Sequence, residues 1–200
     1  MSGEIHALGP EGTNLYSYIH RERVWCTNVD PPESAATVIK PWDQRMTPTY
    51  VQSATEDAMI INIPFAVPVR IKSIVLNTGR GEYAPQRCTV YVNRPYGVDM
   101  DDLPGCEAHT DSRVGAPPES GSAQADFALL PGFAVYPLNA ARFAHTTSVS
   151  VVMSEPDADV SRTLFIGFLG SAPGQPQAAV QHMDVPAANA ATDIYGDSQC

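Results

Sequence analysis

Positively charged residues are scarce in this chain. Lysine and arginine together number 12 against 22 aspartates and glutamates, so the net charge is -10 at pH 7. A negative field of that size repels phosphate backbones and anionic lipid headgroups. We therefore expect neither nucleic acid nor membrane surfaces among its partners.

Long apolar runs are absent as well. The most apolar stretch, residues 57–76, is interrupted by two prolines, an arginine and a lysine, whereas a membrane-spanning helix needs about 20 consecutive apolar residues. The opening residues, MSGEIHALGPEGTN, contain neither the basic nor the apolar region of a secretory signal. We expect a cytoplasmic protein, with the nucleus as a second compartment.

Closely spaced cysteines and histidines are missing too. The four cysteines, Cys26, Cys88, Cys106 and Cys200, form no CxxC pair, and the five histidines form no HxH or HExxH motif. In a cytoplasmic chain such thiols usually stay free, and the apolar neighbours of Cys26 and Cys88 predict that these two are buried. No metal ion and no other cofactor is expected.

Catalytic signatures do not occur either. A nucleophilic serine or cysteine usually sits on a sharp elbow such as GxSxG, which this sequence lacks. The segment TGRGEY at residues 78–83 contains glycines but not the GxxxxGK pattern of a phosphate-binding loop, and we interpret it as a turn. The acidic pairs at 56–57 and 101–102 are expected to be solvated surface groups. We therefore expect no enzyme.

The residues that are present favour one all-β domain. The chain has 200 residues, 44% of them hydrophobic and 17% charged, with 14 glycines and 18 prolines. This length suits a single domain, and this balance suits short strands joined by turns. Apolar strand patterns occur at residues 57–65, 70–78, 88–93, 127–130, 133–138, 148–153 and 163–170. We predict two packed sheets, in a jelly-roll-like β-sandwich.

The segments between and beyond these strands define the domain limits. Residues 1–14 are polar and predict a flexible N-terminal arm, so the domain is expected over residues 15–170. Residues 103–125 are rich in Pro, Gly, Ser and acidic side chains, which predicts a long mobile loop. Residues 171–200 are poor in large apolar side chains and predict an extended C-terminal arm.

Eight segments of the chain resemble a known family in their order and content. They are LYSYI (15–19), VWCTN (24–28), KPWDQR (40–45), YVQSATEDAMIINIPF (50–65), VPVRIKSIVL (67–76), VYVNRP (90–95), RFAHTTSVSVVM (142–153) and TLFIGFLG (163–170). Together they are similar to the PITH domain, a family named for a proteasome-interacting thioredoxin-like protein. The stretch 103–125 is longer than in that pattern, so no contact of this loop is carried over.

The resemblance implies a fold and a function. It implies a β-sandwich of the galactose-binding-like type, in agreement with the strand pattern. Without an attached thioredoxin domain the chain is most similar to stand-alone members, and only the docking function is carried over. We therefore expect a non-catalytic protein-binding module, monomeric when alone, that docks on the 26S proteasome. The alternatives are a permanent structural subunit of a large assembly, such as a cytoskeletal or ciliary one, and a carbohydrate-binding sandwich.

Four residues of the domain are candidates for the binding surface. Trp42, Arg45, Arg80 and Tyr83 are of the types that dominate the energetics of protein interfaces. The same types could stack on a sugar ring and hold its hydroxyl groups, although only fold analogy supports that use. A third interpretation makes Trp42 an aromatic residue at the edge of the core.

The C-terminal arm supplies three more candidates. Val185 and Tyr195 are two of its spaced apolar residues, and the thiolate and carboxylate of Cys200 could reach a metal ion or a cleft of the partner. A segment that cannot bury a core orders only on another surface. The other interpretation of this arm is an inert solubilising tail.

Overall fold

The structure, a computed structural model, describes residues 13–103, 124–129 and 132–174. Its described residues form mostly strands, joined by turns and short 3₁₀ helices. The strands are β1 (Thr13–Asn14), β2 (Trp25–Thr27), β3 (Val29–Asp30), β4 (Val51–Ser53), β5 (Met59–Asn77), β6 (Arg87–Val92), β7 (Gln124–Ala128), β8 (Phe133–Pro137), β9 (Thr146–Ser154), β10 (Arg162–Thr163) and β11 (Phe165–Ser171). The 3₁₀ helices are η1 (Tyr16–Tyr18), η2 (Arg21–Arg23), η3 (Pro32–Val38), η4 (Trp42–Gln44) and η5 (Met100–Asp102). None of the helices in these ranges has the length and apolar content needed to cross a bilayer.

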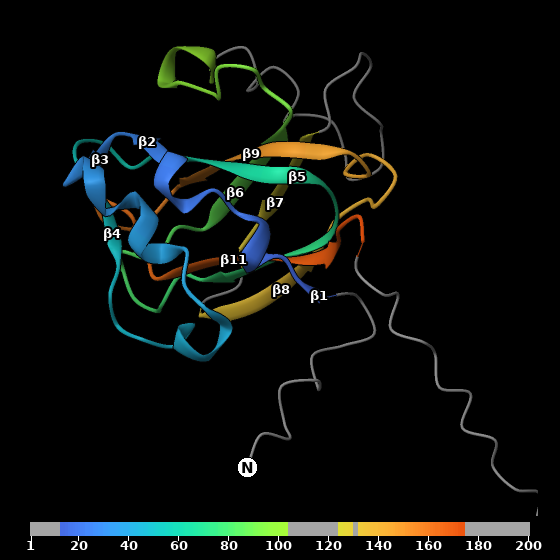
Figure 1. Cartoon of the computed structure of the whole chain (residues 1–200). Helices are drawn as coiled ribbons and strands as arrows, with labels where there is room; N and C mark the ends of the chain where they lie inside the picture. The colour runs from blue at the N-terminus through green and yellow to red at the C-terminus, as the bar shows by residue number, and fades with distance from the viewer. Residues whose placement is uncertain (1–12, 104–123, 130–131, 175–200) are drawn as a thin grey trace, which may run out of the picture.

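The long strand β5 belongs to both layers of the sandwich (Figure 1). Its first half lies between β2 and β9, and its second half lies between β11 and β8. The register with β9 shifts between Pro64 and Val69, which pair with Ser148 and Thr146. The strand curls at this irregularity, and one continuous sheet therefore folds over to give two layers.

This continuity corrects the prediction of two separate strands at 57–65 and 70–78. Pro64 and Pro68 suggested an interruption, because proline has no N–H to donate to a neighbouring strand. In the structure the chain stays extended through both prolines, which lie where the pairing with β9 changes register. The carbonyl of Pro64 accepts a hydrogen bond from the backbone N–H of His20 at 2.9 Å.

Two strand sets make up the layers, and every pairing between the described strands is antiparallel. The first layer has the order β2-β5-β9-β6-β7, and the second has the order β1-β11-β5-β8. A small sheet of β10, β4 and β3 closes one end. The prediction of an all-β, jelly-roll-like sandwich is confirmed.

The main core lies between the two layers. It takes alternate residues of each strand, including Ile61 and Ile63 of β5, Val149 of β9 and Phe168 of β11, all buried. Alternation of this kind follows from the two-residue period of a strand. The intervening residues face outward, where further chain covers them.

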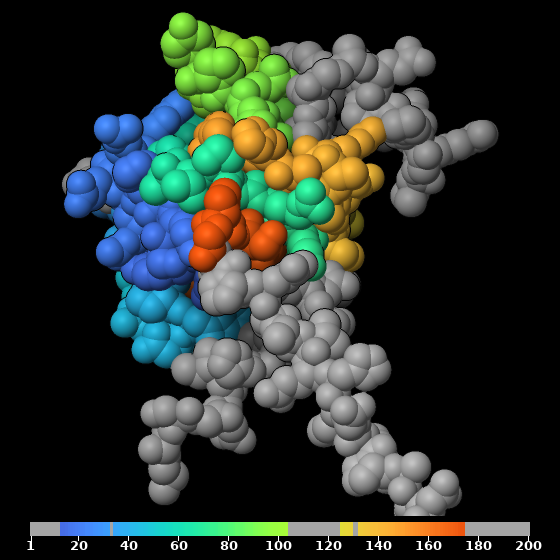
Figure 2. Space-filling model, turned by 45° about the vertical axis from the view of Figure 1, so that its right-hand side comes forward, coloured from blue at the N-terminus to red at the C-terminus, as the bar shows by residue number. Residues whose placement is uncertain are grey.

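Each outer face carries its own small apolar cluster. On the first layer Ile60, Tyr91 and Val152 are buried under Val98 and the segment of η5. On the second layer Val75, Phe165 and Leu169 are buried together with the half-buried Trp42 and Phe133. Figure 2 shows the light green segment of η5 standing above the surface of β5 and β9. The first-layer face beside this segment contains the candidate site.

The described strands also bear on the other predictions. The segment 78–83 is a turn, with Gly79 and Gly81 at φ of 68° and 98°. Strand β1 and the last residue of β11 lie just outside the predicted limits 15 and 170, and most of the predicted loop 103–125 lies outside the described residues.

The two described cysteines differ in exposure. Cys88 is fully buried as predicted, and burial raises the pKa of its thiol. The prediction for Cys26 was wrong, because this residue is only partly buried and its thiol donates to the carbonyl of Pro32 at 3.0 Å. Its strand β2 is an edge strand, which leaves one side open.

Candidate functional site

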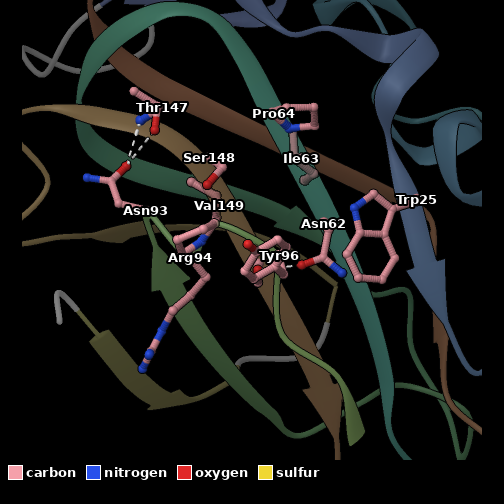
Figure 3. Close-up of a pocket in the computed structure, with 13 residues that line it drawn as sticks. Trp25, Asn62, Ile63, Pro64, Asn93, Arg94, Tyr96, Thr147, Ser148 and Val149 are labelled. Atoms are coloured by element: carbon pink, nitrogen blue, oxygen red, sulfur yellow. Dashed lines mark hydrogen bonds between the residues drawn. The ribbon is translucent and has the colours of Figure 1, made fainter. Parts of the chain in front are cut away.

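An open pocket of about 420 Å³ lies on the outer face of the first layer (Figure 3). This volume is within the range of about 300–1,000 Å³ typical of ligand sites. Strands β5 and β9 form its floor, β2 lies on one side, and the loop after β6 lies on the other. Its lining consists of Trp25, Asn62, Ile63, Pro64, Asn93, Arg94, Pro95, Tyr96, Gly97, Thr147, Ser148, Val149 and Ser150.

Trp25 forms one wall of the pocket. It begins the edge strand β2, where it pairs with Asn62 of β5, and 42% of its surface remains exposed. Its ring packs closely on Gly97, since a Cβ at that position would collide with the indole and with the side chain of Asn62. Gly97 also has φ of 72°, which favours glycine. The sequence therefore fixes both the loop and the ring that lies against it.

The buried side chain of Asn62 anchors the loop to the sheet. Its Oδ1 accepts a hydrogen bond from the N–H of Val98 at 3.1 Å, and its Nδ2 donates to the carbonyl of Val98 at 3.4 Å. The hydroxyl of Ser150 also donates to Asn62 Oδ1. All these bonds are internal, so the amide of Asn62 holds the site together.

Asn93 holds the other end of the loop. It has φ of 57°, and its Nδ2 donates to the carbonyl of His145 at 2.8 Å. Its Oδ1 accepts from the N–H and the hydroxyl of Thr147, at 2.8 and 3.0 Å, as the dashed lines in Figure 3 show. Between these two anchors stands Tyr96, whose surface is 93% exposed.

Arg94 is the one charged side chain that lines the pocket in the described part of the chain. Its side chain extends away from the rings of Trp25 and Tyr96 (Figure 3). Its Cζ lies 5.8 Å from the ring centre of Tyr91, and its buried Nε has no hydrogen-bond partner in the described part of the chain. The pocket itself is therefore bordered by aromatic, aliphatic and neutral polar groups.

Two of the predicted site residues, Trp42 and Arg45, lie together on the opposite layer. The Cζ of Arg45 is 4.5 Å from the ring centre of Trp42, and its Nη1 donates to the Trp42 carbonyl at 2.8 Å. The ring of Trp42 meets Phe133 and Phe165 edge-on, with centroids 5.9 and 6.2 Å apart. Residues of the same chain thus already cover much of the surface of this indole.

The other predicted residues lie elsewhere. Tyr83 packs on the guanidinium of Arg162, whose Cζ is 3.9 Å from its ring centre and 4.8 Å from that of Tyr50. Arg80 is exposed in the turn before it and lies near Gly132. Val185, Tyr195 and Cys200 fall outside the described residues.

Side chains suited to metal binding do not gather in the described ranges. There, no three His, Cys, Asp or Glu side chains lie where they could hold a metal ion. Burial lowers the pKa of Lys40, whose Nζ donates to the carbonyls of Thr47 and Thr49 at 3.3 and 2.8 Å. These two bonds tie down the loop after η4 and give Lys40 a structural role.

Sequence reasoning missed the residues that border the pocket. Trp25 and the NRP of residues 93–95 belong to two separate segments of the family resemblance, VWCTN and VYVNRP. The local signal was Asn93 and Gly97 on either side of an aromatic, which is typical of a tight loop that presents a side chain. The contact between Trp25 and this loop depends on the pairing of β2 with β5, which no local pattern reveals.

The family model described as PITH domain matches residues 6–187. The chain belongs to the PITH domain family. A PITH domain-containing protein of Schizosaccharomyces pombe is 35% identical over 101 residues, which cover 50% of this PITH domain protein and 48% of that relative. PITH domain-containing protein 1 of Homo sapiens is 28% identical over 158 residues, or 78% of this chain and 68% of the relative. The names of these relatives state a domain and no catalytic activity.

Solved structures share the fold of this PITH domain. A carbohydrate-binding module of Clostridium perfringens, solved with GalNAc-beta-1,3-galactose, has a TM-score of 0.53 at 9% identity and covers 79% of this chain and 100% of its own. A family 32 module from the NanJ protein of the same organism, solved with galactose, has a TM-score of 0.51 at 7% identity, with coverage of 78% and 97%. These matches confirm the galactose-binding-like sandwich.

Proposed function

We propose that this PITH domain binds another protein through the pocket bordered by Trp25 and Tyr96. The observation that supports this most directly is the pair of exposed aromatic rings beside one open pocket. Tryptophan and tyrosine are enriched among the few residues that supply most of the energy of protein binding. Such rings lose water contact only when a partner covers them.

The stiffness of the pocket wall adds support. Asn62 and Asn93 fix the two ends of the loop, and Gly97 packs on Trp25. A surface that is already ordered loses less conformational entropy when it binds. The loop therefore suits recognition better than a freely moving segment would.

We propose the 26S proteasome as the partner. The support for this step is the resemblance to PITH domains, whose family name refers to proteasome interaction. We propose the other candidate surfaces as secondary contacts. They are Trp42 with Arg45, Arg80, Tyr83, and the C-terminal arm with Val185, Tyr195 and Cys200. Permanent incorporation into a large assembly would use the same kind of surface and differs in lifetime.

Carbohydrate binding is the weaker alternative for the same pocket. The modules with this fold were solved with sugars, but their identity to this chain is at most 9% for the two described above. Sugar sites need polar side chains that are free to bond hydroxyl groups, whereas the amides of Asn62 and Asn93 are engaged in internal bonds. The pocket therefore favours a ligand that needs few hydrogen bonds.

Direct binding to purified 26S proteasome tests the proposal. The full-length chain is immobilised, and the capture of proteasome is compared between the unchanged protein and the Trp25→Ala/Tyr96→Ala variant over a series of salt concentrations. We expect the variant to lose at least 2 kcal/mol of binding free energy, by the ~2 kcal/mol criterion for interface hot spots. Equal capture by a folded variant would exclude this pocket, and absence of any capture would exclude the proteasome as partner.

A further inference from the structure

We propose that the occupant of the pocket is an extended, proline-containing segment of the partner, in the polyproline II conformation. This inference rests on the proposed function and specifies the chemistry of the partner. Segments of this kind commonly bind in grooves lined by aromatic residues, because the preformed helix loses little entropy.

Few hydrogen-bonding groups of the pocket remain available to a ligand. The amides of Asn62 and Asn93 and the hydroxyls of Thr147 and Ser150 are used internally. By contrast, the indole N–H of Trp25 and the hydroxyl of Ser148 have no hydrogen-bond partner among the described residues, and the indole nitrogen lies on the pocket side of the ring (Figure 3). The site therefore offers donors to a ligand's carbonyl groups.

The pocket also carries little charge beside its aromatic rings. Among the described residues, no carboxylate and no lysine lines it, and the one guanidinium in that lining extends away from the aromatic rings. A strongly acidic or basic segment would leave its charges without partners there, which is costly when they lose water. The occupant is therefore a neutral stretch of chain.

Proline satisfies both conditions. It has no N–H, so a proline-containing segment needs fewer acceptors, while its carbonyls stay free to accept from the indole. Its ring is apolar and can pack on the faces of Trp25 and Tyr96. Pro64 and Pro95 add further apolar surface to the lining. An α-helix would instead consume the carbonyls that this pocket can bond.

The sequence makes a direct optical test possible, because the chain has only two tryptophans. In a full-length Trp42→Phe variant the fluorescence comes from Trp25 alone. The probe is acetylated and amidated decaproline, and the control is a ten-residue Gly-Ser peptide with the same blocked ends. We expect a saturable change in emission with decaproline and none with the control. Calorimetry on the unchanged chain repeats the titration in case the variant folds poorly.

The Trp25→Ala variant, followed by calorimetry, should bind decaproline at least tenfold more weakly, which corresponds to about 1.4 kcal/mol. Absence of decaproline binding up to millimolar concentration would overturn the inference, as would saturation by galactose alone. A further full-length variant has Pro173, Pro176 and Pro186 changed to alanine. If decaproline binds this variant but not the unchanged chain, the chain's own tail is the occupant, and the assignment to a partner is overturned.

The decaproline titration and the proteasome capture can fail independently of each other. If decaproline does not bind but Trp25→Ala/Tyr96→Ala still impairs proteasome capture, the pocket binds protein and the proline chemistry is wrong. If decaproline binds but capture is unaffected, the proposed partner surface is wrong and the ligand class stands.

Discussion

The two tryptophans of this domain lie on opposite outer faces in different surroundings. Trp42 is in contact with Arg45, Phe133 and Phe165 of its own chain. Trp25 lies beside an open pocket with 42% of its surface exposed. A tryptophan that is covered in the free protein stabilises the fold, whereas an exposed one gains most of its contacts only when a partner arrives.

The arginines on these two faces also differ in what they cover. The guanidinium of Arg45 lies over the ring of Trp42, in the geometry of a cation–π interaction. The guanidinium of Arg94 lies near Tyr91 and is turned away from Trp25. Residues of the same chain thus complete one face, whereas the other face presents aromatic surface that the described part of the chain leaves exposed.

The largest effect on stability is expected at Trp42. Trp42→Ala removes the ring that covers Val75, Phe165 and Leu169, and should lower the free energy of unfolding by about 3 kcal/mol, at the lower end for a buried tryptophan. Urea denaturation measures the change, with Trp42→Phe as a milder control. A loss below about 0.5 kcal/mol, the range of ordinary surface changes, would mean that Trp42 does not stabilise this face.

A smaller loss is expected at Gly97. Gly97→Ala combines an unfavourable positive φ with a collision against Trp25 and Asn62, and should cost about 1–3 kcal/mol. Gly81→Ala is the matched control, because Gly81 also has a positive φ, of 98°, but no atom within 4 Å of an added Cβ. Chemical denaturation should show the larger loss at Gly97. Equal losses would show that Trp25 does not pack tightly on the loop.

The free energy of unfolding should depend on pH because of Cys88, which lies in the main core between the two faces. Burial raises the pKa of Cys88 in the folded state, while an unfolded thiol loses its proton near pH 8.5. Above that pH the unfolded state binds fewer protons, so stability should fall by up to about 1.4 kcal/mol per pH unit through this one group. Denaturation of Cys88→Ala between pH 8 and 10 should show a shallower slope. Parallel slopes would contradict the effect.

The smallest change in stability is expected at the exposed aromatics. Tyr96→Ala removes a side chain that is 93% exposed and should change the unfolding free energy by no more than about 0.5 kcal/mol. Trp25→Ala should cost more than this but less than Trp42→Ala, because its ring contacts Gly97. Thermal melting of the three single variants checks the order. A Tyr96 variant as unstable as the Trp42 variant would contradict the comparison.

The layers of the fold could be predicted from the sequence because they depend on local alternation. Met59, Ile61 and Ile63 face the main core while Ile60 faces the outer cluster, as their alternation predicts for a strand covered on both sides. The continuity of β5 could not be predicted, since Pro64 and Pro68 ordinarily interrupt a strand. Here they lie where the strand changes its neighbours, which is a property of the whole sheet.

The sequence could predict which residue types the candidate site contains, but not their positions. The sequence predicted Trp, Tyr and Arg side chains at the binding surface. The tryptophan it predicted was Trp42, which other residues of the same chain partly cover. Trp25 and Tyr96 border the same pocket only because β2 pairs with β5 and Asn62 bonds to Val98, thirty-six residues later. Contacts at such a distance follow from the fold, and neither spacing nor composition contains them.

Capture of purified 26S proteasome by two double variants tests the central claim most directly. Trp25→Ala/Tyr96→Ala should remain folded and lose at least about 2 kcal/mol of binding free energy, or about thirtyfold in affinity. A Trp42→Phe/Arg45→Lys variant, which keeps an aromatic and a positive charge on the other face, should bind within about twofold of the unchanged chain. The reverse result, with capture lost in the Trp42/Arg45 variant and kept in the Trp25/Tyr96 variant, would contradict the account and place the partner on the other face.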